Sequence, residues 1–369
     1  MSNLYFIIFG ISIVGSFLSK KNYKYFLIIV LAVLMYYAYH YDYHPGTDLY
    51  RRVEEMELYR RVGFDYVVEN RLNTNPLSAL FFYFFSIFDN PGVLPAFTVF
   101  ICYGIGFSLL LKCYDRFDLS IEQRNLLYAV FMLSFYYDQA ISNIRIYICF
   151  AIVSYFMYEE IIERKYKILS WIMYVACCFF HYAILPFVSL RLLLFVKKRF
   201  KNSDIILIVG TILLFVMGER VLSVFVKMGS VFQTLYDKMD AYETYSRFGT
   251  WQYLSSIVRL IFFTCVLFYV KNKSQDFDKK DDYITFYMIC VCAMIVVMYN
   301  NYQFVFRSLN YLHYLCMVPL SMFLKKSNEE KKERELMKYV LIKYGLIISV
   351  MYTFAYQAVF IHPSVNFLF

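Results

Sequence analysis

Residues 40–52, HYDYHPGTDLYRR, crowd histidine, aspartate, tyrosine and arginine side chains between two long apolar runs. Histidine and aspartate side chains can accept a proton, and arginine side chains can bind an anion through several N–H groups. The pair Pro45-Gly46 predicts a turn that brings the chain back toward the second run. The stretch is either an ordinary solvated loop or the edge of a working site.

Four cationic side chains lie inside apolar runs, where a charge is costly in a membrane. Arg191 and Lys343 lie within a turn or two of the ends of their runs, so we expect them to reach the membrane surface. Arg259 and Arg307 lie deeper, and their charge calls for polar partners or water. Such residues are candidates for a functional site.

Two helical stripes of polar side chains contain these deeper arginines. Residues spaced three, four and seven apart share one face of a helix. A water-filled cavity and an interhelical hydrogen-bond network are the two interpretations of such stripes. His313 falls on another face, where we expect a hydrogen bond to a neighbouring helix. The stripes comprise Gln252, Ser255, Ser256 and Arg259, and then Gln303, Arg307, Asn310, Tyr311 and Tyr314.

The composition is that of an integral membrane protein. Of 369 residues, 60% are hydrophobic and 18% are charged, whereas roughly a quarter are charged in soluble domains. Apolar runs that approach the length of a membrane span, about 20 residues, recur along the whole chain. They predict an all-α polytopic domain over residues 1–369 with about twelve crossings. The expected spans are 3–18, 25–41, 93–113, 126–140, 146–158, 168–182, 184–196, 204–218, 251–270, 283–299, 304–324 and 339–360.

Basic residues predict the orientation, because links rich in Lys and Arg stay on the cytoplasmic side. Most of the 37 Lys and Arg residues fall in six such links, so the net charge of +9 does not call for a nucleic acid partner. The run 77–88 is about 18 Å long as a helix, too short to cross, and is expected to be re-entrant or interfacial. If the run 77–88 does not cross the membrane, all six basic links lie inside and links 42–76 and 219–250 lie outside. The six basic links are 19–25, 112–125, 159–167, 197–203, 271–282 and 325–338.

The outer link 42–76 is predicted to hold an amphipathic helix at 48–62. Thr47 can cap its first turn, and Gly63 can end it. Most of its arginines, Arg52 among them, are expected to meet water or lipid headgroups. Two ion pairs with a spacing of four residues are expected on this helix: Arg51–Glu55 and Glu57–Arg61.

Several polar residues outside that helix also fall in the outer half of the membrane under this topology. Arg145 starts a span just after Asn143, and His181 ends another. Arg259 and Arg307 lie in the outer halves of their spans. The basic links that predict the topology contain none of these four residues, so their shared side predicts a single outward-facing site.

The order of several short motifs is similar to that of the EpsG family, which includes Wzy-type polymerases of O-antigen and capsule. The resemblance covers about residues 42–196. It implies a GT-C-like transferase that joins undecaprenyl-pyrophosphate-linked repeat units on the outer face of the bacterial inner membrane, without a metal or cofactor. The motifs are Gly46-Thr47-Asp48-Leu49-Tyr50, Asn143-Ile144-Arg145, the basic link 163–167, and Phe180-His181-Tyr182-Ala183.

The reaction that the resemblance implies needs cationic ligands and a base, and residues along the whole chain are candidates for these roles. Arginines suit the charge of a pyrophosphate leaving group, and a base must take the proton of the acceptor hydroxyl. The expected partners are undecaprenyl-pyrophosphate-linked glycans, the lipid bilayer and a Wzz-type chain-length regulator. The pyrophosphate ligands are Arg145, Arg259 and Arg307; the base candidates are Asp48, His181 and His44; and the substrate contacts are Tyr50, Arg51, Asn143, Arg247, Gln252, Asn310 and Tyr311.

Two other classes of membrane protein stay open. A flippase for the same lipid-linked sugars would favour internal repeats and charged residues in both leaflets, whereas the buried cations here are expected on the outer side. Another transferase, such as an O-antigen ligase or an acyltransferase, is the second alternative. The three arginines favour a pyrophosphate donor over an acyl donor.

Overall fold

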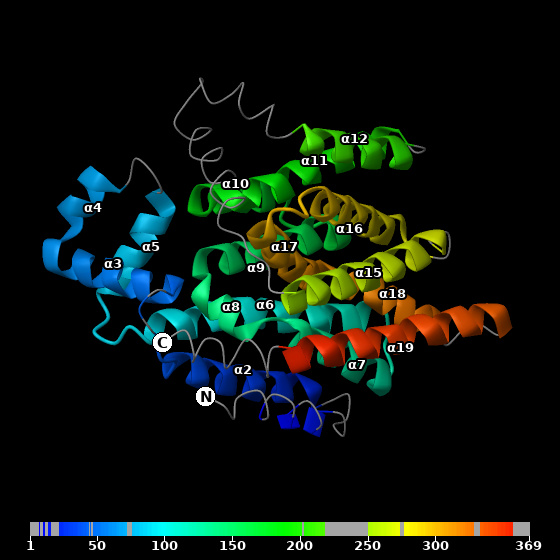
Figure 1. Ribbon diagram of the computed structural model, residues 1–369, viewed down its shortest axis with the longest axis horizontal. Coiled ribbons are helices and arrows are strands. Elements are labelled where there is room, and N and C mark those ends of the chain that lie inside the picture. The colour runs from blue at the N-terminus through cyan, green and yellow to red at the C-terminus, as the bar shows by residue number, and fades with distance from the viewer. Residues whose placement is uncertain are drawn as a thin grey trace. The chain divides into compact units, whose positions relative to one another are not determined.

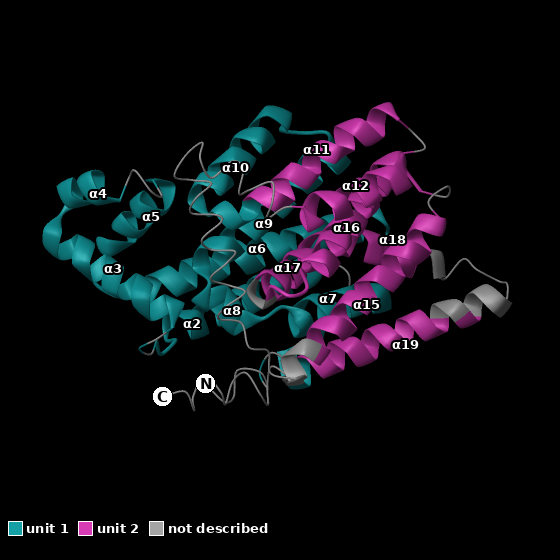
Figure 2. Cartoon of the chain, turned by 45° about the horizontal axis from the view of Figure 1, so that its top comes forward, with its two compact units in different colours: residues 1–184, 354–369 teal, residues 185–353 magenta. Residues whose placement is uncertain are grey.

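The computed structural model describes residues 22–43, 45, 47–71, 76–200, 203–217, 250–273, 277–327 and 333–356, together with a few positions before residue 22. Every regular element in this part of the chain is helical, so the all-α prediction is confirmed (Figure 1). The chain divides into two compact units, one formed by residues 1–184 and 354–369, the other by residues 185–353 (Figure 2).

Unit 1 is built around α6 (Val93–Arg116), which packs against α2 (Tyr23–Tyr39) and α9 (Ile144–Met157). α9 continues directly into a π-helical turn, η1 (Tyr158–Glu163), and α10 (Lys167–Phe180) packs back against α9. The remaining elements of this unit are α3 (Asp48–Val62), α4 (Phe64–Asn70), α5 (Pro76–Ser86), α7 (Ile121–Ser134), α8 (Tyr137–Ser142) and the 3-10 turn η2 (Tyr182–Ile184).

Helix α3 has the bounds expected for the outer helix, Asp48–Val62. The Thr47 side chain accepts a hydrogen bond from the Tyr50 backbone N–H (3.2 Å), which satisfies one free donor of the first turn. Gly63 ends the helix at a φ of 82°, a conformation that favours glycine. The buried face consists of Leu49, Val53, Met56 and Tyr59.

The short apolar run forms α5, a helix of 11 residues that packs against α3. Arg60 of α3 donates hydrogen bonds to the Ser86 carbonyl (2.9 Å) and the Phe88 carbonyl, at the C-terminal end of α5. A cation at this end complements the helix dipole. In the turn that follows, a Cβ on Gly92 would lie 2.1 Å from the Tyr39 carbonyl oxygen, so glycine is needed there.

Unit 2 is built around α16 (Lys279–Val297), which packs against α11, α12, α15, α17 and α18. Helix α16 is buried nearly all round, as expected for a central helix surrounded by others. Its neighbours are α11 (Leu185–Arg199), α12 (Asp204–Val216), α15 (Thr250–Asn272), α17 (Tyr302–Leu315) and α18 (Met317–Ser327); α19 (Glu333–Tyr356) follows.

Some predicted spans are divided in the structure. The span 126–140 is wrong, because α7 stops at Ser134 and α8 begins at Tyr137. The span 304–324 is interrupted at Cys316, between α17 and α18. Pro319 lacks an N–H, so it is tolerated in the first turn of α18 but not in the interior of one long helix.

Two described helices are long and apolar enough to cross a membrane by length and composition, Val93–Arg116 and Leu254–Asn272. Several others are apolar but have only 10–17 residues. The expected number of about twelve crossings and the membrane position of α5 are therefore not confirmed and stay predictions.

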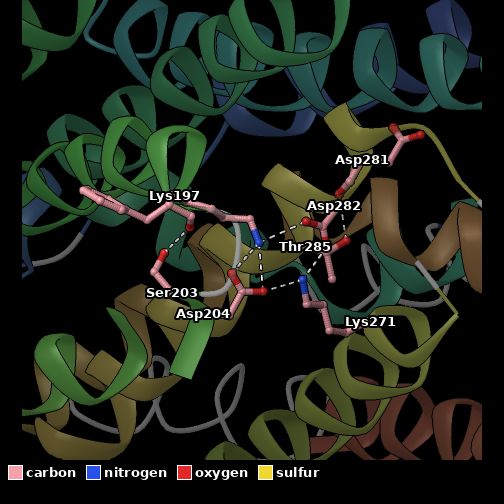
Figure 3. Close-up of polar contacts among 8 residues, drawn as sticks. Lys197, Ser203, Asp204, Lys271, Asp281, Asp282 and Thr285 are labelled. Carbon is pink, nitrogen blue, oxygen red and sulfur yellow. Dashed lines mark hydrogen bonds and ion pairs between the residues drawn. The ribbon is translucent and has the colours of Figure 1, made fainter. Parts of the chain in front are cut away.

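A square of alternating charges connects four helix ends in unit 2 (Figure 3). Lys197 at the end of α11 lies between Asp204, 2.7 Å away at the start of α12, and Asp282, 3.0 Å away at the start of α16. Lys271 at the end of α15 contacts the same two carboxylates. Each aspartate lies in a first turn and each lysine in a last turn. Every charge is therefore opposite in sign to the partial charge of the helix end where it lies, which is favourable.

Replacing Asp282 with Asn should destabilise unit 2, because Lys197 and Lys271 would then share one carboxylate. The side chain of Lys197 is only 5% exposed, whereas the other three are 21–24% exposed. We therefore expect a loss of about 1–3 kcal/mol, below that for a fully buried pair. Thermal unfolding of the detergent-purified protein measures it. Asp278→Asn, at an exposed N-cap where Asn is equally suitable, is the matched control; equal melting of both variants would contradict the prediction.

Candidate functional site

Asp48 anchors a network of charges on the first turns of α3. Both neighbouring arginines reach its Oδ1 atom, Arg51 at 3.0 Å and Arg52 at 3.5 Å. Arg52 also binds Glu55 Oε2 at 2.7 Å, and its guanidinium lies 5.2 Å from the centre of the Phe82 ring on α5. The Arg52 side chain is therefore held on three sides, by two carboxylates and an aromatic face.

Tyrosine hydroxyls extend this network along α3. Tyr59 donates a hydrogen bond to Glu55 Oε1 at 2.6 Å. Burial, together with this bond and the charge of Glu55, raises the pKa of Tyr59, so its hydroxyl stays a donor. The hydrogen bond from Tyr50 to Glu54 likewise raises the pKa of Tyr50. Glu55 is thus fixed from both sides, by Arg52 and Tyr59.

The expectations for the charged side chains of α3 need correction. Arg52 was expected at the surface, but its side chain is only 18% exposed because Phe82 and two carboxylates surround it. Arg51 pairs with Asp48 in place of Glu55, and Arg61 approaches the Glu57 backbone carbonyl (3.4 Å) in place of its side chain. Arg52 pairs with two carboxylates of its own helix, and its contact with Phe82 of α5, which the spacing along one helix does not reveal, shields it from solvent.

Arg145 lies in the first turn of α9, two residues after Asn143 at the N-cap position. Asn143 donates a hydrogen bond to the Gln139 side-chain oxygen at 2.8 Å, across the joint between α8 and α9. The half-buried Arg145 side chain donates to Ser78 Oγ on α5 at 3.4 Å. The predicted outer motif therefore lies against the short helix α5.

His181 occupies the break after α10, where its backbone is extended. Its Nδ1 atom accepts a hydrogen bond from the Ala183 backbone N–H at 3.2 Å. A neutral imidazole that accepts at Nδ1 carries its proton on Nε2. In its neutral form His181 therefore has its acceptor nitrogen, Nδ1, already bonded to the Ala183 N–H, which does not suit the role of a base.

Arg259 connects two helices of unit 2. Its side chain is 2% exposed and donates a hydrogen bond from Nη2 to Asn310 Oδ1 on α17 at 3.0 Å. The Asn310 amide donates to the Phe306 carbonyl at 3.0 Å, which turns Oδ1 toward the arginine. These contacts match the interhelical-network interpretation of the polar stripes.

His313 also lies on this helix contact. Its Nδ1 atom is 3.2 Å from Arg259 Nη2 and 2.9 Å from the Leu309 carbonyl oxygen. One nitrogen cannot donate to the carbonyl and accept from the guanidinium at once; the shorter distance and the acceptor-only carbonyl favour donation to Leu309. His313 therefore contacts Arg259 of α15 but hydrogen-bonds within its own helix, and the predicted hydrogen bond to a neighbouring helix stays a prediction.

The other expected site residues have varied surroundings. Tyr311 is fully buried, and its hydroxyl lies 2.8 Å from that of Tyr287 on α16. Arg307 is half-buried on α17. His44 and Arg247 lie outside the described residues, and so does the side chain of Gln252. Arg145 and His181 belong to unit 1, whereas Arg259 and Arg307 belong to unit 2, so their predicted convergence stays a prediction.

Buried charges also occur near the helix ends that were expected to face the cytoplasm. Arg191 is fully buried with its guanidinium 5.0 Å from the Phe195 ring, so the expectation that it reaches the membrane surface is wrong. Glu159 in the π-helical turn is also buried and binds Lys112 of α6 at 2.7 Å. An aromatic neighbour on the next turn explains the position of Arg191, and a basic neighbour on another helix explains that of Glu159. Buried charge is therefore not confined to the outer half.

Metal ligands do not gather in the part of the chain that the structure describes, where no three His, Cys, Asp or Glu side chains form a group that can hold an ion. The acidic side chains of α3 are instead engaged with arginine and tyrosine. The functional groups that α3 presents are thus guanidinium donors, carboxylate acceptors and tyrosine hydroxyls.

A family model described as the EpsG family matches residues 25–368. The chain belongs to the EpsG family. The match extends well beyond residues 42–196, where the motifs lie, and includes the whole of unit 2. No curated protein and no solved structure matches the chain. The EpsG family is associated with polysaccharide polymerase-like proteins, and this EpsG-family chain is a membrane protein of polysaccharide biosynthesis.

Replacing Asn310 with Leu should destabilise the EpsG-family chain, because the buried Arg259 loses the acceptor that Asn310 provides. The expected loss is about 1–3 kcal/mol for a buried donor without its partner. Thermal unfolding in detergent measures it. Asn125→Leu, at a half-buried asparagine near the start of α7 in unit 1, is the control for the change of residue type. An unchanged melting temperature for Asn310→Leu would contradict the bridging role.

Proposed function

We propose that this protein is a polymerase of undecaprenyl-pyrophosphate-linked oligosaccharide repeat units, acting on the outer face of the bacterial inner membrane in the synthesis of O-antigen or capsule. The observation that carries the proposal is the family match over residues 25–368. The guanidinium, carboxylate and histidine groups of unit 1 supply the chemistry that such a reaction needs.

The reaction is a glycosyl transfer. A hydroxyl oxygen of the acceptor repeat unit attacks the anomeric carbon of the donor sugar, and a new C–O bond forms. The bond between that carbon and the pyrophosphate oxygen breaks, and undecaprenyl pyrophosphate leaves with the electron pair. The hydroxyl proton passes to a base on the protein. Charge develops on the leaving pyrophosphate, so fixed cationic donors stabilise the transition state.

Arg145 is the pyrophosphate ligand proposed in unit 1. A guanidinium offers planar paired donors that match phosphate oxygens and stays charged at every physiological pH. Its contact with Ser78 Oγ, at 3.4 Å, is long for a hydrogen bond. Arg259 and Arg307 are proposed for the same chemistry on the grounds of their depth in apolar helices.

Asp48 is the preferred base among the three candidates. Both arginines approach its Oδ1 atom, so Oδ2 is the atom proposed to accept the hydroxyl proton. In its neutral form the His181 imidazole carries its proton on Nε2, so it is better suited to donate a hydrogen bond to a substrate oxygen than to act as a base. His44, four residues before Asp48, lies outside the described residues and stays a candidate.

A flippase for the same lipid-linked sugars is the second candidate function. Buried charges such as Glu159 and Arg191, near ends expected on the cytoplasmic side, fit a protein with polar groups in both leaflets. The arginines and the carboxylate next to outer motifs favour the transferase, as they also do over an acyltransferase. A Wzz-type chain-length regulator and the lipid bilayer are the proposed partners.

Deleting the gene from its host separates these functions. The polymerase proposal predicts single-repeat glycans in place of a ladder when the surface polysaccharide is run on a gel, because units are still exported but not joined. Complementation with the intact gene should restore the ladder. Complete loss of surface glycan points to the flippase instead, and an unchanged ladder would overturn the polymerase proposal.

Replacing Arg145 with Lys should reduce the ladder strongly, by about tenfold or more in long chains, because Lys has no planar paired donors. Immunoblotting of membrane fractions checks that the variant is present in normal amounts. Arg61→Lys, at an exposed arginine of α3, is the matched control and should leave the ladder intact. A normal ladder from Arg145→Lys would contradict the pyrophosphate role.

A further inference from the structure

A hollow on α3 and α4 lies beside the charge network of Asp48. Its volume is about 290 Å³, and its lining comes from two turns of α3 and the C-terminal end of α4. This volume is close to the lower limit of small-molecule sites, about 300 Å³, and is sufficient for one or two sugar rings. The lining residues are Arg51, Arg52, Glu54, Glu55, Leu58 and Arg71.

The charges of this lining are balanced. Three arginines and two glutamates line the hollow, and Asp48 adds a third carboxylate next to two of the arginines. Such a wall has little net attraction for an anion, but it presents guanidinium donors and carboxylate acceptors side by side. Sugar hydroxyl groups both donate and accept hydrogen bonds, so a wall of this kind complements an uncharged sugar.

Part of this wall is fixed before any ligand arrives. Arg52 is held by Asp48, Glu55 and the Phe82 ring, and Glu55 is held in turn by Tyr59. Side chains that are already ordered lose little conformational freedom on binding. In contrast, the Arg51 side chain is 67% exposed and can close over a ligand.

An aromatic pair adjoins the hollow. Tyr50 directly precedes the lining residue Arg51, its pKa is raised by the lining carboxylate of Glu54, and its ring lies 6.3 Å from that of Tyr43. Tyrosine rings present apolar faces together with a polar hydroxyl, a combination that suits a sugar ring with one apolar face. The hollow and the pair together offer both kinds of contact that a carbohydrate makes.

We propose that this hollow is a subsite for a sugar unit of the acceptor glycan, with Arg51, Glu54 and Arg71 making the hydrogen bonds that determine which repeat unit is extended. The proposal rests on the polymerase function, since the acceptor carries the hydroxyl that must reach Asp48. Arg51 and Arg52 touch both Asp48 and the hollow, so a sugar bound there lies next to the proposed base.

Binding of free oligosaccharide to the purified full-length protein tests the subsite without requiring polymerisation. The probe is the single-repeat oligosaccharide released by mild acid from the lipid carrier of the deletion strain, and a linear glucan of matched length is the control sugar. We expect saturable binding of the probe and at least about fivefold weaker binding by Glu54→Gln, Arg51→Gln and Arg71→Gln, each of which removes one or more hydrogen bonds.

Helix α3 supplies matched controls on its own exposed surface. Glu57→Gln and Arg61→Gln make the same chemical changes outside the hollow and should bind the probe like the unmodified protein. Equal binding by the lining and control variants, equal binding of the glucan, or no saturable binding by the unmodified protein would each overturn the subsite. These outcomes are independent of the deletion ladder, so failure of the subsite and failure of the polymerase proposal are distinguishable.

Discussion

A charge inside an apolar helical protein must be paired or hydrogen-bonded, because leaving it alone costs several kcal/mol. The described charged side chains of this protein follow that constraint. Arg259 is buried against Asn310, Glu159 against Lys112, and Lys197 against two aspartates. These contacts join helices that are separate along the chain, so the same groups that are costly to bury also determine how helices pair.

Helix α3 shows the same constraint at the surface of the protein. Its apolar face packs on α5, and Arg52 is drawn into that contact by the Phe82 ring and two carboxylates. The polar side chains of α3 that lie outside this contact are ordered or partly ordered, and they lie beside Asp48. A helix that looks from its sequence like a solvated amphipathic segment thus carries a preorganised set of donors and acceptors, and family membership gives that set a context in polysaccharide synthesis.

The charge square of unit 2 shows which features of a charged residue its own helix predicts and which depend on the packing of other helices. An aspartate in a first turn and a lysine in a last turn are features that the sequence itself displays, each favourable to its own helix. That Lys197 and Lys271 share the same two aspartates depends on α11, α12, α15 and α16 packing side by side (Figure 3). No spacing along one helix predicts it.

The sequence by itself determined the helical class, the family, and the bounds of α3, because composition, motif order and capping residues are local properties that require no neighbour. Tertiary structure alone decided the contact of Arg52 with Phe82, the burial of Arg191, and the partners of Arg145 and Arg259. The physical reason is that a charged or polar side chain takes the best partner within reach, and reach is set by which helices pack together. Periodicity predicts the face on which a residue lies, but not the side chain that it meets there.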